Sequence, residues 1–406
     1  MARRSLRRLA VAVAGAGRAH HHHRMSQRNH SNRPKPHLEQ KDFTGGGIQM
    51  LSSRLKGSTG DPALDAALHA AVVRAGIDES RADLIVEMMV TAVKTGRDAP
   101  AIGDLKLMNR ALKEMRRANR VFQPYEDKRK VVCYGSARLA EDSPECVQAR
   151  EFARRMVAEG YMVITGAGDG IMGAAQQGAG RDASFGLNIA LPFEQSANPV
   201  IDGDPKLLTF NYFFTRKLSF VKEGHAFALF PGGFGTMDEG FELLTLIQTG
   251  KGVVEPIVMI DSPGGYYWRT FVDFLGNHLL RQKLISEEDF HLFHVTDSAA
   301  EAVAEILRFY SVFQSYRYVG KLMVVRVSRA LPDDALKTMN REFADLLLEG
   351  GRFEQRDALP QEEEDPAIAD LPRIVFPFRR RSFGRLRQWI DFVNQAGAAA
   401  APPNGE

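Results

Sequence analysis

The sequence has few cysteines and no long apolar run, and both absences limit what the protein can be. Its 406 residues include only Cys133 and Cys146, too few for a disulfide framework or a four-cysteine zinc site. Its apolar runs are shorter than the roughly 20 residues that span a bilayer, so we expect no membrane partner. This composition is typical of a protein from a reducing, cytoplasmic compartment.

Acidic residues outnumber basic ones after the first 38 residues. The formal net charge is +3, but that stretch carries nine Lys or Arg and no acid, so the remaining chain carries −6. A domain that binds nucleic acid needs a basic surface, and single-strand binding also needs stacking aromatics in a basic groove. We therefore expect no nucleic-acid partner.

The N-terminus has the composition of a disordered or targeting segment. Residues 3–8 are mostly basic and residues 9–15 apolar, as in an export signal, but Arg18 and the histidines at 20–23 interrupt the cleavage zone. We expect residues 1–60 to be disordered, as well as the tail at 397–406. A targeting peptide and metal binding by the histidines are the alternatives, and whether residues 1–24 are translated stays open.

Hydrophobic periodicity divides the rest of the chain into three regions. Residues 61–128 show helical spacing and predict a helical cap that serves packing or dimer contact, with helices at 63–75, 79–94 and 105–122. Residues 318–396 predict a small α/β C-terminal region, with strands at 322–327 and 374–378 and helices at 333–348 and 383–393. The arginines at 379–381 in that region are typical of a solvated face, with an anionic effector site as the alternative.

Between these regions, residues 129–317 alternate short apolar runs with helical stretches. The alternation predicts an α/β fold with a doubly wound, parallel, Rossmann-like sheet. The expected strands are at 131–134, 161–165, 185–191, 226–230 and 256–261, and the expected helices include 146–159, 210–221, 241–249, 268–281 and 299–313. Ligands in such sheets bind beyond the carboxyl ends of the strands.

A glycine loop follows the predicted strand at 226–230. Gly232, Gly233 and Gly235 allow a backbone to approach an anion closely, and Thr236 can cap the next helix or bind a phosphate oxygen. We expect Glu239 in the first turn of that helix. An acid beside a phosphate site indicates chemistry on a phosphorylated molecule, because phosphate binding alone gains nothing from a nearby negative charge.

Two more loops follow predicted strands, and neither matches a common nucleotide fingerprint. Gly135 and Ser136 follow the first strand; Gly166, Gly168 and Gly170 follow the second, but Ile171 stands where a dinucleotide fingerprint needs its third glycine. The chain has no phosphate-binding loop of the type that ends in Gly-Lys-Ser/Thr. Pyridoxal phosphate needs a Schiff-base lysine. Lys217 would have to give up its charge beside Arg216, so we expect no cofactor.

Taken together, these loops resemble those of the LOG family of phosphoribohydrolases, whose members are also labelled lysine decarboxylases. The resemblance covers about residues 100–320, and the 23-residue separation of Arg216 and Glu239 matches the family spacing. The matching residues are Gly135, Ser136, the run from Gly166 to Gly173, Arg216, Lys217, the run from Pro231 to Thr236, and Glu239.

The resemblance implies hydrolysis of the N-glycosidic bond of a nucleoside 5′-monophosphate, AMP or an N6-modified AMP of the cytokinin type, to a free base and ribose 5-phosphate. It makes Arg216 and Glu239 the catalytic pair and implies a homodimer or larger assembly without a metal. The implied substrate and phosphate contacts are Gly135, Ser136, Gly166, Gly168, Asp169, Gly170, Ile171, Met172, Gly173, Lys217, Gly232, Gly233, Gly235 and Thr236.

The residues themselves agree with this chemistry. Cleavage of the bond builds positive charge on the ribose, which a carboxylate such as Glu239 stabilises, and Arg216 can hold a phosphate through its planar fork. Asp169 and Arg138 differ from the shorter family pattern, so the preferred base stays open. The alternative function is a non-catalytic nucleotide-binding sensor of the same superfamily; the presence of both Arg216 and Glu239 favours the enzyme.

Overall fold

The computed structural model describes residues 57–192, 196–362 and 368–399. Most of the two termini that we expect to be disordered lie outside these residues. The same holds for the export-like segment and for the histidine run. Within the described ranges, every helix is too short or too polar to cross a bilayer.

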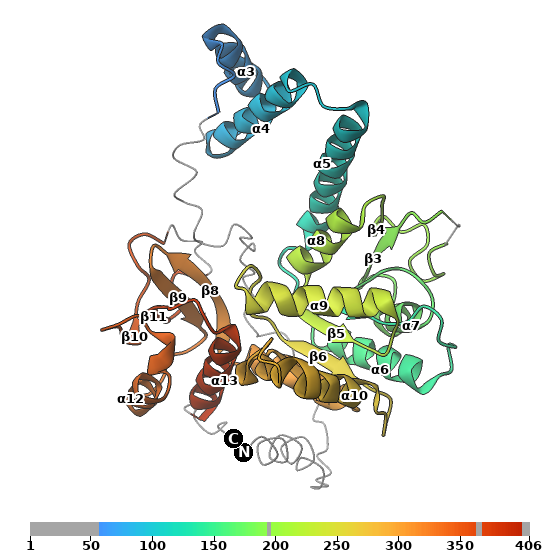
Figure 1. The fold of residues 1–406 in the computed structure, drawn as a ribbon, viewed down its shortest axis with the longest axis vertical. Coiled ribbons are helices and arrows are strands. Elements are labelled where there is room, and N and C mark those ends of the chain that lie inside the picture. The colour runs from blue at the N-terminus through green and yellow to red at the C-terminus, as the bar shows by residue number, and fades with distance from the viewer. Residues whose placement is uncertain (1–56, 193–195, 363–367, 400–406) are drawn as a thin grey trace.

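A parallel sheet of seven strands forms the centre of the protein (Figure 1). Its order is β4-β3-β2-β1-β5-β6-β7, so the chain winds outward from β1 in one direction and then returns to β5 on the other side. The doubly wound α/β prediction is confirmed. The strands are β1 (Lys130–Tyr134), β2 (Met162–Thr165), β3 (Ser184–Ile189), β4 (Leu207–Phe210), β5 (Ala226–Leu229), β6 (Ile257–Ile260) and β7 (Phe293–Thr296).

Helices cover both faces of this sheet, and side chains of β1 alternate between them. Val131 and Cys133 pack with α6, α7 and α11, whereas Val132 and Tyr134 pack on the opposite face with α8, α9 and α10. Full burial of the strand is expected when a parallel sheet is covered on both sides. The helices are α6 (Pro144–Ala158), α7 (Ile171–Ala179), α8 (Phe213–Glu223), α9 (Phe234–Gln248), α10 (Tyr267–Phe274), the π-helical turn η3 (Leu275–Leu280), η4 (Glu287–Leu292) and α11 (Ala299–Phe309).

Two strands of the sheet were not predicted, and both lie at its edges. The helix expected at 210–221 was placed too early, because Phe210 ends β4 and α8 begins at Phe213. The helix expected at 299–313 ends at Phe309, and Phe313 instead begins β8. Strands β4 and β7 have four residues each and are partly exposed, so their hydrophobic pattern is weak.

The N-terminal helices extend away from the sheet (Figure 1). Helices α3 (Pro62–Arg74) and α4 (Glu79–Arg97) contact each other, and α5 (Ile102–Phe122), followed by the 3-10 turn η2 (Gln123–Tyr125), contacts α8. The buried Glu114 of α5 fixes the start of α8: it accepts hydrogen bonds from the Asn211 backbone (2.9 Å), the Asn211 amide (2.8 Å) and the Thr215 hydroxyl (2.6 Å).

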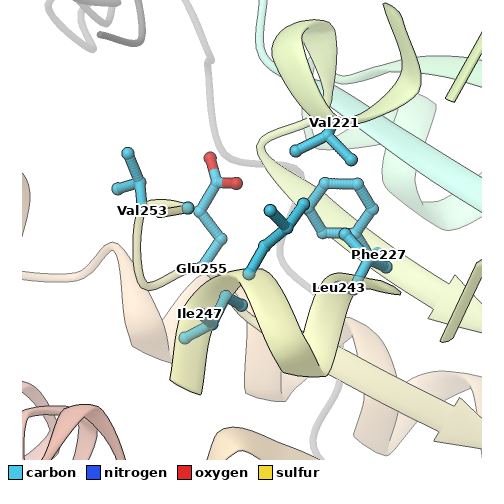
Figure 2. Close-up of a pocket in the computed structure, with 8 residues that line it drawn as sticks. Val221, Phe227, Leu243, Ile247, Val253 and Glu255 are labelled. Carbon is cyan, nitrogen blue, oxygen red and sulfur yellow. The ribbon is translucent and has the colours of Figure 1, made fainter. Parts of the chain in front are cut away.

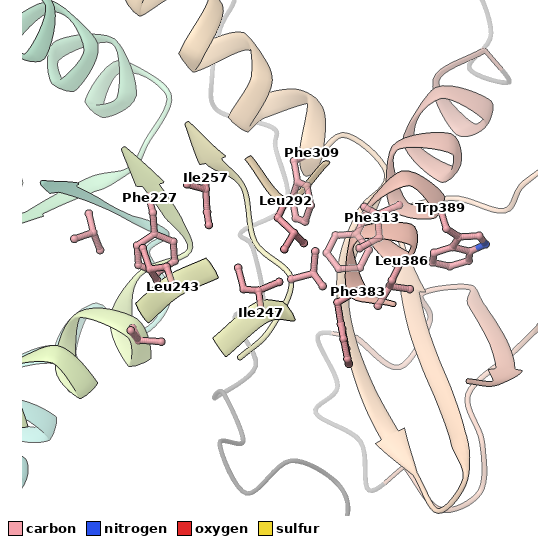
Figure 3. Packing of buried hydrophobic residues seen from close by; sticks show 14 of the residues in the cluster. Phe227, Leu243, Ile247, Ile257, Leu292, Phe309, Phe313, Phe383, Leu386 and Trp389 are labelled. Atoms are coloured by element: carbon pink, nitrogen blue, oxygen red, sulfur yellow. The ribbon is translucent and has the colours of Figure 1, made fainter. Parts of the chain in front are cut away.

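The C-terminal region forms a second, antiparallel sheet in the order β10-β11-β9-β8. Its elements are β8 (Phe313–Val319), β9 (Leu322–Val327), α12 (Asp333–Glu342), η5 (Ala344–Leu346), β10 (Glu354–Arg356), β11 (Arg373–Pro377) and α13 (Phe383–Ala399). Strands β8 and β10 were not predicted, and the helix expected at 333–348 ends at Glu342. Figure 3 shows Phe309, Phe313 and Phe383 joining this region to the core under the parallel sheet, so one buried cluster runs through both.

Candidate functional site

Backbone hydrogen bonds join the three glycine loops at the carboxyl edge of the parallel sheet. The Ser136 N–H donates to the Pro231 carbonyl (3.1 Å), and the Ile171 N–H donates to the Ser136 carbonyl (3.0 Å). Strands β1 and β5 are neighbours, and the strand order reverses between them. The loops therefore meet at the topological switch point, where doubly wound sheets bind ligands.

Close packing between the loops requires glycine at several of these positions, Gly170 and Gly232 among them. Gly170 has a φ of +58°, and a Cβ there would lie 2.4 Å from the Ser136 carbonyl oxygen. A Cβ on Gly232 would lie 2.1 Å from the Thr236 hydroxyl and 3.0 Å from the Ser136 nitrogen. By contrast, a Cβ on Gly233 or Gly235 would meet nothing within 4 Å, so the space above the α9 N-terminus is open.

Two helix N-termini are uncapped by side chains at this cluster. Helix α7 follows Gly170 and α9 follows Gly233, and neither N-cap residue makes a side-chain hydrogen bond. Gly233, Phe234 and Gly235 are exposed, and Phe234 is 97% exposed. Free backbone N–H groups and the helix dipole make such a terminus an anion-binding site.

The loop after β2 is held in a strained conformation by Asn198. Ala167 has a φ of +64°, which is unfavourable for a residue with a Cβ. The Asn198 amide donates to the carbonyls of Ala167 (3.1 Å) and Gly168 (3.0 Å), and its backbone N–H also donates to Ala167 (2.8 Å). Gly168 and Gly173 are buried and Ile171 belongs to the core, whereas Asp169 is exposed and Met172 half-buried.

Arg216 lies between this loop and β3. Its Nε donates to the Leu187 carbonyl (2.7 Å), and its guanidinium lies over the Phe220 ring at 5.2 Å. A Cβ on Gly166 would lie 2.4 Å from Nη2 of Arg216, so the guanidinium lies directly against the loop after β2. Burial lowers the pKa of Arg216, and the opposing charge of Glu239 limits that effect.

Glu239 is a buried carboxylic acid without a partner. It is 7% exposed and forms no hydrogen bond or ion pair with the described residues. Burial raises its pKa from 4.5 to about 7, although the positive charges of Arg216 and Lys217 act in the opposite direction. The acid therefore changes protonation near neutral pH, as a general base does in many active sites.

The position of Glu239 on its helix differs from the expectation. Helix α9 begins at Phe234, five residues earlier along the chain, so Glu239 lies in the second turn and not in the first. At 1.5 Å per residue it lies about 7.5 Å along the axis from the first helical residue. The acid and the N-terminus of α9 are thus separate positions along the helix.

Lys217 is held by two carboxylates of α9. Its Nζ lies 2.9 Å from an oxygen of Asp238 and 2.9 Å from an oxygen of Glu242. The interactions with these two carboxylates raise its pKa against the effect of burial. Lys217 therefore ties α8 to α9 and contributes positive charge next to Glu239.

Three residues at the site were missed by the sequence reasoning. Tyr134 ends β1 beside Gly135, Asn198 supports the loop after β2, and the Tyr267 hydroxyl donates to the Gly232 carbonyl. Tyr134 carried a signal, because a polar residue at the carboxyl end of a buried strand reaches a ligand site. Asn198 and Tyr267 lie far along the chain from any glycine loop, and no local pattern marks them.

A separate apolar cavity lies near the amino ends of β5 and β6 (Figure 2). It is lined by Val221, Phe227, Leu243, Ile247 and Glu255, among others, and its volume of about 10 Å³ accommodates at most one water. In parallel strands the amino and carboxyl edges are opposite, so this cavity is remote from the glycine loops. Among the described residues, no three His, Cys, Asp or Glu side chains are grouped so that they hold a metal ion.

Comparison with known protein families agrees with the geometry. A family model described as "Possible lysine decarboxylase", the label also given to LOG proteins, matches residues 172–306, which contain Arg216, Lys217 and the loop from Pro231 to Glu239. Residues 172–306 of this chain are therefore similar to this family. A search of curated proteins found no match to this chain.

Among solved structures, similar chains include the structural genomics target TM1055, with 23% identity, a TM-score of 0.32, and coverage of 43% of this chain and 96% of that one. A molybdenum cofactor carrier protein from Chlamydomonas reinhardtii has 20% identity, a TM-score of 0.30, and coverage of 44% and 94%. A molybdenum cofactor binding protein from Rippkaea orientalis has 18% identity, a TM-score of 0.30, and coverage of 45% and 96%. At these identities and TM-scores, the likenesses give no basis for transferring a ligand or an activity.

Proposed function

We propose that this protein hydrolyses the N-glycosidic bond of nucleoside 5′-monophosphates, AMP or an N6-modified relative, to a free base and ribose 5-phosphate. The observation that carries the proposal is Glu239: a buried, unpaired carboxyl with a pKa of about 7, beside Arg216 and one and a half turns from an open helix N-terminus. A site that only bound phosphate would be weakened by this acid.

The proposed arrangement assigns one part of the substrate to each part of the site. The 5′-phosphate binds the N–H groups at the starts of α7 and α9, with Thr236 adding a hydroxyl donor. The ribose then extends along α9 toward Glu239. When the bond between the anomeric carbon and the base breaks, positive charge develops on that carbon, and the Glu239 carboxylate stabilises this charge and takes a proton from the attacking water as the new C–O bond forms. The base departs with the electron pair of the broken bond and then takes up that proton, which regenerates the carboxylate.

Arg216 supplies a fixed positive charge on the other side of this space. Because its Nε is held by the Leu187 carbonyl, the two terminal nitrogens keep one orientation. They are free to bind the phosphate or the departing base through the planar fork. Lys217 supports binding electrostatically, since Asp238 and Glu242 already occupy its ammonium group.

The experiment incubates the full-length protein with a panel of nucleoside 5′-monophosphates and the matching nucleosides, and measures free base and ribose 5-phosphate. We expect release from one or more monophosphates and none from the nucleosides, because the nucleosides lack the phosphate. Glu239→Gln should lower the rate by about 10²–10⁴-fold, and Glu87→Gln, at an exposed acid of α4, should leave it unchanged.

Two results would count against this function. Release at the same rate from wild type and Glu239→Gln would show a contaminating activity. Tight binding of a monophosphate in calorimetry without any base release would identify a nucleotide-binding sensor.

We also propose that the protein is a homodimer or larger homo-oligomer, as the LOG resemblance implies. Phe213, Phe214 and Leu218 of α8 are 54%, 51% and 39% exposed, on the helix that carries Arg216. Exposed apolar groups of this kind are common at subunit contacts. Light scattering measures the mass of the particle in solution. A mass of 45.1 kDa, that of one chain, across the working concentration range would refute this assembly.

A further inference from the structure

Two buried polar groups without partners face the same part of the core. The Tyr134 hydroxyl is inaccessible to solvent and has no hydrogen-bond partner, and Tyr134 as a whole is 5% exposed. Glu239 is 7% exposed, and none of the hydrogen bonds given for the described residues involves its carboxyl. One group is a donor and the other an acceptor once it is ionised.

The fold places these groups in one neighbourhood. Tyr134 is the last residue of β1 and points to the face covered by α8 and α9. Its ring meets Phe220 of α8 edge to face at 5.1 Å, and the Arg216 guanidinium lies over the same Phe220 ring. Burial raises the pKa of Tyr134 well above 10, and the nearby Glu239 charge raises it further.

An unpaired buried hydroxyl is unfavourable in the ligand-free protein. Burial removes the hydroxyl from water, and no hydrogen bond compensates for the lost hydration. A phenylalanine at this position would fill the same space without that free-energy cost. Hydrogen bonds at catalytic sites are often too long in ligand-free structures and shorten when substrate binds. Among the buried hydroxyls without a partner in the described residues, that of Tyr134 is the one that ends a strand beside a glycine loop, where a bound ligand can change its surroundings.

We propose that Tyr134 is a positioning residue whose hydroxyl donates a hydrogen bond to the Glu239 carboxylate when a nucleotide occupies the glycine loops. The inference rests on the proposed function and adds a residue to that site. The hydrogen bond orients the carboxylate toward the anomeric carbon. It also favours the ionised form, so the pKa of Glu239 falls when the ligand binds.

If Tyr134 has this role, its removal should affect the pH profile of kcat but not that of kcat/KM. The profile of kcat/KM reports the free enzyme, in which the hydrogen bond is absent, and the profile of kcat reports the complex, in which it is present. In Tyr134→Phe we expect the acidic midpoint of kcat/KM to stay near its wild-type value. The midpoint of kcat should move to higher pH, and kcat should fall by about 10–100-fold, the range expected for a lost hydrogen bond to a charged group.

The control is Tyr161→Phe. Tyr161 is also buried with its pKa raised by burial, but it lies next to the amino end of β2, near Arg129. This variant should keep both midpoints and kcat. Neither variant should lower Tm, because each removes one buried hydroxyl and leaves the ring in place. A Tyr134→Phe protein with wild-type kcat and an unshifted kcat midpoint would overturn the inference while the proposed function stands.

A second measurement works without turnover. Calorimetric titration with ribose 5-phosphate at pH 7, in two buffers of different ionisation enthalpy, gives the number of protons released on binding. Wild type should release more protons than Tyr134→Phe, because only wild type lowers the pKa of Glu239 in the complex. Equal proton release by the two proteins would refute the role of Tyr134, even if no monophosphate is hydrolysed and the proposed function fails.

Discussion

The raised pKa of Glu239 predicts that replacing it with glutamine changes how stability depends on pH. In the folded protein the acid titrates near pH 7, whereas in the unfolded chain it titrates near 4.5. Between these two values the folded state holds a proton that the unfolded state has lost. The free energy of unfolding of wild type therefore falls as pH rises from about 4.5 to about 7.

The size of this effect follows from the shift. At about 1.36 kcal/mol for each pKa unit, moving from 4.5 to about 7 corresponds to about 3 kcal/mol. Because Glu239 is only 7% exposed, screening by solvent reduces this free energy only slightly. Glu239→Gln has no group to ionise, so it should gain about 3 kcal/mol relative to wild type between pH 4.5 and pH 7.5.

The assay is urea unfolding of both proteins at several pH values in this range, with Glu87→Gln as the control for loss of an exposed carboxyl. The difference between Glu239→Gln and wild type should grow with pH, and the control difference should stay flat. A difference that does not change with pH would show that Glu239 titrates normally. The account of its role as a base poised near neutrality would then be wrong.

Other substitutions test the supports of the site. Asn198→Ala leaves the strained Ala167 loop without its amide donor, so we expect a loss of about 1–3 kcal/mol in urea unfolding and a higher KM. Gly232→Ala places a methyl group against the Thr236 hydroxyl and should weaken ribose 5-phosphate binding in calorimetry at least tenfold, whereas unchanged affinity would contradict the proposed phosphate position. Glu114→Ala removes the acceptor of three hydrogen bonds at the start of α8 and should lower Tm by several degrees; an unchanged Tm would show that α5 does not stabilise α8.

The central strands and the glycine loops were predictable because each is a local pattern. Strands such as β1 and β5 are fully buried and read as continuous apolar runs, and the loop from Gly232 to Thr236 follows one of them directly. The edge strands β4 and β7 were not predictable in this way. They are short and partly exposed, and their place is fixed by pairing with β3 and β6.

The same distinction applies to the site. Arg216 and Glu239 were predicted as site residues because they stand at a recognisable spacing near the glycine loop. The contact between Asn198 and the Ala167 carbonyl joins residues 31 positions apart, and that from Tyr267 to Gly232 spans 35 positions. Such contacts depend on how loops meet in space. The start of α9 was misjudged because its first turn contains Gly235 and follows the N-cap Gly233, and glycine is a poor helix former.

The most direct test of the central claim is the pH dependence of AMP hydrolysis, measured as adenine released at substrate concentrations below KM. We expect kcat/KM to rise with pH through a midpoint near 7, set by ionisation of Glu239. In Glu239→Gln, this rise with pH should disappear along with most of the activity. Hydrolysis with an acidic midpoint near 4.5, or a rise with pH that survives in Glu239→Gln, would contradict this claim.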